Sequence, residues 1–198
     1  MMSQKRTHTQ LSSMPFIGLW MLAHIVAWWV IYAVSEEMSV LNSYPDWVAA
    51  TVFGIIMAII VPITQKALIR RKLGVQLRGW LRLSAVGWIV GMISIIIIPE
   101  VLEDIVSGDP IWTYVIGAFT LPAIAQWLIL RRVVRGAWVW MIAGLASAFA
   151  FSAILENSPY SSDFFPYWVI ATATQGAVTG ISLLWIFHQN RPTAKAKS

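Results

Sequence analysis

Long apolar stretches alternate with short polar segments along the whole chain. The hydrocarbon core of a membrane is about 30 Å thick, so a helix needs about 20 mostly apolar residues to cross it. The pattern predicts six such helices, over residues 15–34, 47–65, 81–98, 111–130, 137–155 and 167–187. Little chain remains between them. We therefore expect one all-α integral-membrane domain over residues 1–198, in which residues 188–198 form a short basic tail.

The charged residues support the count of six. All 14 Lys and Arg residues lie in the terminal segments and in every second connection, and all nine Asp and Glu residues lie in the other three connections. A wrong number of crossings would mix the two sets. Because Lys and Arg in short loops stay on the cytoplasmic side, both termini are predicted to be cytoplasmic, in a bacterial inner membrane.

The composition fits this interpretation. Hydrophobic residues make up 58% of the chain and charged residues 12%, against about 45–50% and 25% in soluble domains. The absence of cysteine excludes disulfides and thiolate chemistry. The net charge of +5 is the excess of the 14 basic residues in one set of segments over the nine acidic residues in the other. It does not indicate nucleic-acid binding, because the aromatic residues lie in the apolar stretches instead of on a basic surface.

The sequence also contains an internal repeat. Three motifs recur about 60 residues apart: Gln65-x4-Arg70-Arg71 as Gln126-x4-Arg131-Arg132, Trp20-x7-Trp28 as Trp80-x7-Trp88, and Gly117-Ala118-x-Thr120 as Gly176-Ala177-x-Thr179. Trp138 takes the corresponding place at the head of the fifth stretch, and both repeated glutamines are expected at the cytoplasmic interface. The spacing predicts three helical hairpins of one orientation, arranged as a pseudo-threefold bundle or as a linear array. The alternative is that Trp and Arg recur only because both concentrate at interfaces.

Small residues four positions apart indicate close helix packing. They are Gly87 and Gly91, Gly144 and Ala148, and Gly176 and Gly180. Such pairs let helix backbones approach each other where lipid provides no hydrophobic drive for association. A dimer contact and a lining close to a ligand are the alternatives. Pro62 and Pro122 are expected to bend their helices.

His24 is the one ionisable side chain predicted at mid-membrane depth, where such groups are functional candidates. It could hydrogen-bond a neighbouring helix, bind a haem or pigment metal, or take part in proton transfer. The matching positions in the other hairpins are Ser84 and Ile142, so the histidine is not part of the repeated framework.

Uncharged polar residues occur in the fourth and sixth stretches. They are Thr120 and Gln126 in the fourth stretch, and Gln175 and Thr179 in the sixth. These side chains could line a polar seam through the protein. Alternatively, they make separate packing contacts, because Thr can hydrogen-bond the backbone of its own helix.

Enzyme signatures are missing from the sequence. It contains no HExxH, GxSxG or P-loop motif, and we predict neither a catalytic residue nor a metal site. The sequence leaves the cofactor unknown. The expected partners are the lipid bilayer, with anionic headgroups near the arginine pairs, and a membrane protein or a second copy of the chain.

The segment from Gly117-Ala118 to Gln126-Trp127-Leu128-Ile129-Leu130-Arg131-Arg132, followed by Trp138, resembles a group of small bacterial multi-pass membrane proteins. These proteins carry repeated segments of the type GAxxGxxQWLVLRR. The resemblance implies the repeat architecture and identifies no active site.

The missing enzyme motifs, the short connections, the packing motifs and the repeats lead to two expected functions. The first is a non-enzymatic scaffold or accessory subunit that binds lipid, pigment or a membrane partner, and the alternative is a small transporter or channel.

Overall fold

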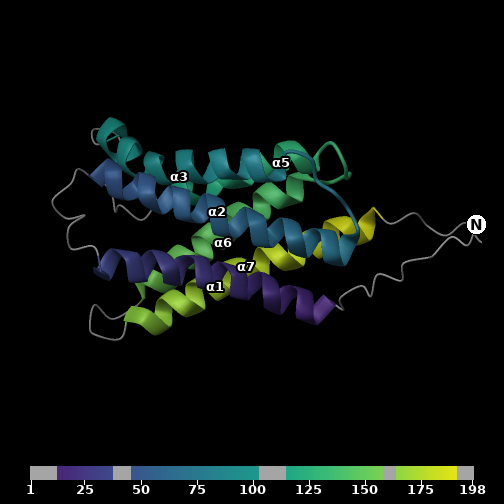
Figure 1. The fold of residues 1–198 in the computed structure, drawn as a ribbon, viewed down its shortest axis with the longest axis horizontal. Helices are drawn as coiled ribbons and strands as arrows, with labels where there is room; N and C mark the ends of the chain where they lie inside the picture. Colours follow the sequence, from purple (N-terminus) through teal and green to yellow (C-terminus); the bar gives the residue numbers. More distant parts are fainter. Residues whose placement is uncertain (1–12, 38–45, 103–114, 158–163, 191–198) are drawn as a thin grey trace, which may run out of the picture.

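The computed structural model describes residues 13–37, 46–102, 115–157 and 164–190, which form helices joined by turns (Figure 1). The helices are α1 (Ser13–Glu37), α2 (Asp46–Leu73), α3 (Trp80–Leu102), η2 (Val115–Thr120), α5 (Leu121–Leu130), α6 (Trp138–Glu156) and α7 (Phe164–Gln189). Each predicted stretch is helical where it is described, and η2 and α5 together form the fourth. The all-α fold is confirmed, and no strand occurs within these ranges.

Four helical segments are long and apolar enough to cross a membrane. They are Ser13–Val34, Trp47–Leu73, Trp138–Glu156 and Pro166–Gln189. The other apolar segments, Trp80–Ile95 and Gly117–Leu130, are shorter within the described residues. The length and composition of the four segments are those of a membrane protein. The count of six crossings stays a prediction.

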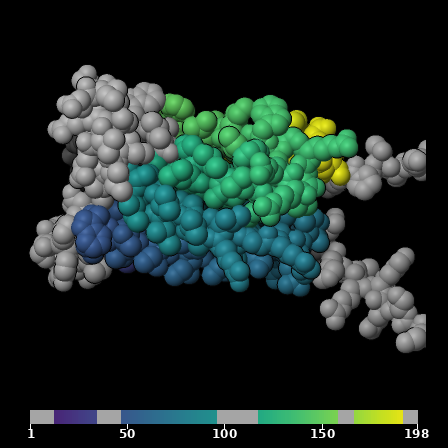
Figure 2. Space-filling view, turned by 90° about the horizontal axis from the view of Figure 1, so that it is seen from above, coloured from purple at the N-terminus to yellow at the C-terminus, as the bar shows by residue number. Residues whose placement is uncertain are grey.

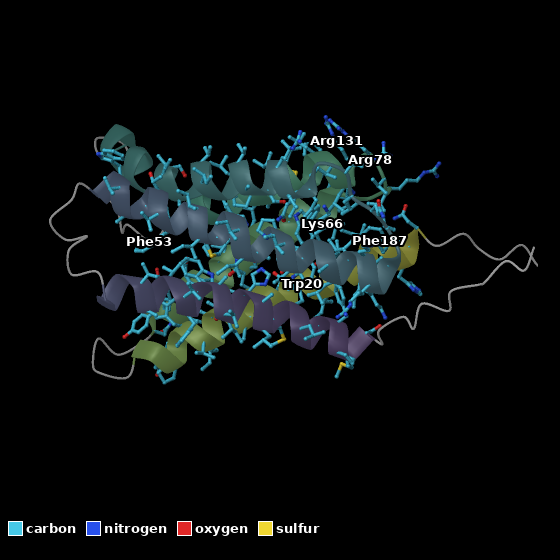
Figure 3. The ribbon with its side chains drawn as sticks, viewed as in Figure 1. Trp20, Phe53, Lys66, Arg78, Arg131 and Phe187 are labelled. Carbon is cyan, nitrogen blue, oxygen red and sulfur yellow. The ribbon has the colours of Figure 1, made fainter. Side chains whose placement is uncertain are left out.

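The helices form a ring that follows the order of the chain. Each packs on the next, from α1 through α2 and α3 to η2 and α5, then to α6 and α7, and α7 returns to α1. Seen from above, α2, α3 and α5 lie side by side on one face (Figure 2). Arg78 and Arg131 lie at the same end of the bundle (Figure 3). We call this the basic end, and the opposite end, where α6 finishes at Glu156, the acidic end.

The second and fourth helices differ from the predicted apolar stretches. The second is longer than predicted, and the fourth changes its helix type before its proline. The second helix continues past residue 65 to Leu73, and Gly74 ends it with a φ of 65° and an N–H bond to the Arg70 carbonyl oxygen of 3.1 Å. The helix also runs on through Pro62. At Pro122, by contrast, the preceding turn η2 is a π-helix. A π-turn is a common way to accommodate a disturbed backbone ladder.

The small residues lie where helices approach closely. A Cβ atom added at Gly87 would lie 2.8 Å from the Cα of Pro122, and one at Gly91 would lie 2.9 Å from the carbonyl oxygen of Gly117. At Gly144 it would lie 2.6 Å from the Cβ of Ala123. Real Cβ atoms do not approach so closely, so glycine at these positions sets the separation of α3 and α6 from the fourth helix.

We expect Gly176→Ala to destabilise the bundle by about 1–3 kcal/mol, the usual cost of overpacking. A Cβ at Gly176 would lie 2.7 Å from the Cα of Met21, so α1 would have to move away from α7. The measurement is unfolding of the purified protein in mixed micelles titrated with SDS. Gly18→Ala is the control, because nothing lies within 4 Å of the added atom. Equal stability of the two variants would contradict the close α1–α7 packing.

Candidate functional site

The core of the bundle consists of two separate hydrophobic clusters. The cluster nearer the basic end includes Phe16, Trp20, Leu68, Ile69, Trp80, Trp140, Leu183 and Ile186. The cluster nearer the acidic end includes Trp28, Met57, Val61, Trp88, Met92, Phe119, Phe151 and Ala171. On α1 and α2, which contribute to both clusters, a buried polar residue lies between the residues of one cluster and those of the other. His24 lies there on α1 and Gln65 on α2, and both are buried.

Three buried tryptophans 60 residues apart meet in the basic-end cluster. The ring centroid of Trp140 lies 6.3 Å from that of Trp20 and 6.4 Å from that of Trp80, and Trp20 lies in the interior in Figure 3. From the sequence we expected Trp138 at the corresponding position of the fifth stretch, but Trp138 is 59% exposed. The buried counterpart of Trp20 and Trp80 is therefore Trp140.

Within the predicted repeat, this replacement of Trp138 by Trp140 changes the position that matches His24 in the third hairpin. With the spacing of 60 residues, the counterparts of His24 are Ser84 and Gly144. Ser84 is fully buried and Gly144 faces the centre of the bundle, whereas Ile142, the position expected from Trp138, is 53% exposed. All three matched positions are therefore buried, and two of them, His24 and Gly144, border the same cavity.

A small cavity lies at this level, and we call it the central chamber. Its volume is about 30 Å³, in a measure where one water needs about 10–15 Å³. Every helix of the ring contributes to its lining, which consists of His24, Gln65, Trp88, Phe119, Pro122, Ala123, Gln126, Trp140, Gly144, Ser147, Gln175 and Thr179. The chamber has room for about two water molecules.

The two repeated glutamines meet in the chamber. The Nε2 atom of Gln126 donates a hydrogen bond of 2.9 Å to the Oε1 atom of Gln65, and the two side chains are 3% and 2% exposed. We expected both glutamines at the cytoplasmic interface. Their side chains instead point inward because the helices continue beyond them, and Arg70, Arg71, Arg131 and Arg132 remain exposed at the basic end.

His24 also faces the chamber. Its Nδ1 atom lies 2.9 Å from the carbonyl oxygen of Trp20. Because a carbonyl oxygen only accepts hydrogen bonds, Nδ1 carries the proton, and Nε2 of the neutral ring is a hydrogen-bond acceptor. His24 therefore offers the chamber one basic nitrogen from a fixed tautomer.

Two indole groups of α1 are held by α7. The Nε1 atom of Trp20 donates to the Oγ1 atom of Thr179 over 3.1 Å, and that of Trp28 donates to the Oε1 atom of Gln175 over 3.3 Å. The two tryptophans that line the chamber, Trp88 and Trp140, are buried with no acceptor for their indole N–H among the described residues.

Four aromatic rings pack together next to the chamber, on the side nearer the acidic end. The ring of Phe151 lies 5.1 Å from Phe119, 5.4 Å from Trp28 and 5.4 Å from Trp168, measured between centroids. We call these four side chains the acidic-end aromatic layer. The chamber thus lies between this layer and the three tryptophans of the other cluster.

Four of the five predicted pathway residues come together in the chamber: His24, Gln126, Gln175 and Thr179. Thr120 does not line it and lies half-buried in η2. Sequence reasoning missed the inward position of Gln65, and it also missed Ser147 and Trp140. The 61-residue spacing of the glutamines and the 60-residue spacing of the tryptophans were the signals for two of these.

The lining determines which guests the chamber accepts. It contains one imidazole, three carboxamides and two hydroxyls, and no carboxylate. In the described part of the chain no group of three or more His, Cys, Asp or Glu side chains could hold a metal ion. The volume leaves no space beside His24 for a haem or pigment ring. The arrangement suits one or two very small, uncharged molecules that donate and accept hydrogen bonds.

The chain matches no protein-family model, no curated protein and no solved structure.

Proposed function

We propose that the chain is a six-span protein of the bacterial inner membrane, built from three hairpins, and that its central chamber conducts a small uncharged solute, of which water is the simplest. The observation that carries this proposal is the convergence of buried polar side chains from the whole ring on one cavity. Polar groups are costly inside a membrane and commonly mark a pathway. Sites at the interface of repeats are typical of transporters.

The proposed orientation places the basic end in the cytoplasm, together with both termini. The chamber then lies between two aromatic layers, in the way that narrow apolar constrictions gate other membrane pathways. In this proposal the structure represents a closed state, because packed aromatic rings lie between the chamber and the acidic end.

A non-enzymatic scaffold or accessory subunit is the second candidate function. The observation that favours it is the small size of the chamber and the hydrogen bonds that already join its walls. Such bonds also serve to fix the partners of a helix bundle. A scaffold needs no passage for solute, so measured permeability distinguishes the two candidates.

We expect Gln126→Leu to lower water flux through reconstituted vesicles about tenfold. The variant removes the donor to Gln65 and one polar wall of the chamber. Loss of a buried hydrogen-bond partner costs about 1–3 kcal/mol, and tenfold in rate corresponds to about 1.4 kcal/mol. The measurement is stopped-flow light scattering of proteoliposomes after an osmotic step.

Thr174→Val is the matched control, because Thr174 is next to Gln175 but bonds the Ile170 carbonyl oxygen of its own helix and does not line the chamber. Its flux should equal that of the unchanged protein. If vesicles with folded protein are no more permeable than empty vesicles, conduction of water is wrong and the scaffold remains.

A further inference from the structure

A second cavity lies on the outside of the bundle, between α1 and α2. Its volume is about 290 Å³, and it is open to the surroundings. On α1 it is lined by Leu19, Leu22, Ala23 and Val26, and on α2 by Ile60, Thr64, Ala67 and Leu68. The only polar group in this lining, the Thr64 hydroxyl, donates to the Ile60 carbonyl oxygen of its own helix over 2.7 Å. We call this cavity the α1–α2 groove, and its walls are apolar.

Two alanines keep the groove open. In the predicted repeat, the counterpart of Ala23 is Leu83, 60 residues later, and the counterpart of Ala67 is Leu128, 61 residues later. Both leucines are half-buried in the second hairpin. The first hairpin therefore has two smaller side chains at these positions, and both line the groove.

The length of the groove is close to the thickness of one leaflet of the hydrocarbon core. The lining of α2 extends from Ile60 to Leu68, which is about 12 Å along a helix at 1.5 Å per residue. One leaflet of the hydrocarbon core is about 15 Å thick. An extended acyl chain can therefore lie along most of the groove, in the half of the bundle nearer the basic end.

A positive charge continues the same face of α2. Thr64, Ala67 and Arg71 follow each other at spacings of three and four residues, so they lie along one side of the helix. The Arg71 side chain is exposed and lies one turn beyond Ala67, about 6 Å closer to the basic end. Arg70 is also exposed at this end. Arginine is well suited to bind a phosphate group.

We propose that the α1–α2 groove binds one anionic phospholipid, with an acyl chain between Ala23 and Ala67 and its phosphate on Arg71. The charge of Arg71 at the end of an apolar groove selects a lipid over a second helix, and a negative headgroup over a neutral one. This site requires only that the bundle lies in a membrane. It does not depend on the function of the central chamber.

Native mass spectrometry of the purified full chain in mild detergent tests this site, with phosphatidylglycerol and phosphatidylcholine as probes. The chain should retain one phosphatidylglycerol in preference to phosphatidylcholine. Ala67→Leu should lower this retention at least fivefold by filling the groove, whereas Ala146→Leu, on the outer surface of α6, should not. Arg71→Gln should reduce the preference for phosphatidylglycerol about fivefold, the value of one basic residue near an anionic surface.

Arg132→Gln is the sharpest control. Arg132 is exposed and occupies the place of Arg71 in the repeated motif, but the position that matches Ala67 in its hairpin is the larger Leu128. Equal losses for Arg71→Gln and Arg132→Gln would show diffuse attraction to the basic end and overturn the site. Unchanged retention in Ala67→Leu would do the same. A dimer that Ala67→Leu dissociates would also overturn it, because the groove would then hold a second copy.

Discussion

Replacing Trp140 by alanine is expected to lower the free energy of unfolding by about 2–3 kcal/mol. The side chain is buried between Trp20 and Trp80 and also borders the central chamber. Its removal leaves a void of roughly 100 Å³, and residual cavities cost about 24 cal/mol per Å³. Dispersion contacts with both neighbouring rings are lost as well. SDS-titrated unfolding in micelles, followed by tryptophan fluorescence, measures the effect.

Trp138→Ala is the matched control for this experiment. Trp138 is on the same helix two residues earlier, has the same side chain, and is 59% exposed on the outer surface. Its removal should change the free energy of unfolding by less than about 0.5 kcal/mol, as for other surface sites. If Trp138→Ala were the more damaging of the two, Trp138 and not Trp140 would face the centre. Matching Trp140 with Trp20 and Trp80 by their spacing of 60 residues would then be wrong.

The positions of the helices could be predicted from the sequence, but the inward faces of those helices could not. A helix that crosses a membrane is apolar on all sides, so hydropathy locates it without orienting it. Trp138 and Trp140 illustrate the difficulty. They are two residues apart on one helix and point in different directions, and one is exposed while the other is fully packed. Chemistry of the side chain is no guide here, and only the spacing of 60 residues distinguishes them.

The sequence predicted most polar residues of the candidate site, but not the direction of every side chain. His24, Gln126, Gln175 and Thr179 stand out because polar residues are rare in apolar stretches, and all four line the chamber. Gln65 was misplaced because charged residues follow it, which made it look like the end of a membrane span. The helix in fact continues to Leu73 and keeps the side chain inside. The spacing of 61 residues marks the two glutamines as matched positions, but it does not predict that they hydrogen-bond each other.

Replacing Phe151 by alanine is expected to raise water flux about tenfold if the chamber is a pathway, equivalent to a barrier about 1.4 kcal/mol lower. Phe151 contacts the three other rings of the acidic-end aromatic layer, so its loss opens that layer. The vacated space is large enough to admit water next to the polar walls. Osmotic shrinkage of proteoliposomes measures the change, and the direction is opposite to that expected for Gln126→Leu.

The controls for Phe151 separate opening of the layer from general loosening of the bundle. Phe149→Ala removes the same ring from the same helix, but at a position that is 46% exposed, so flux should not change. Phe151→Leu keeps most of the side-chain volume and should give an intermediate flux with near-normal stability. A folded Phe151→Ala variant with unchanged flux would mean that the aromatic layer does not close a passage. In that case the buried polar groups act only to join the helices, which is what a scaffold requires.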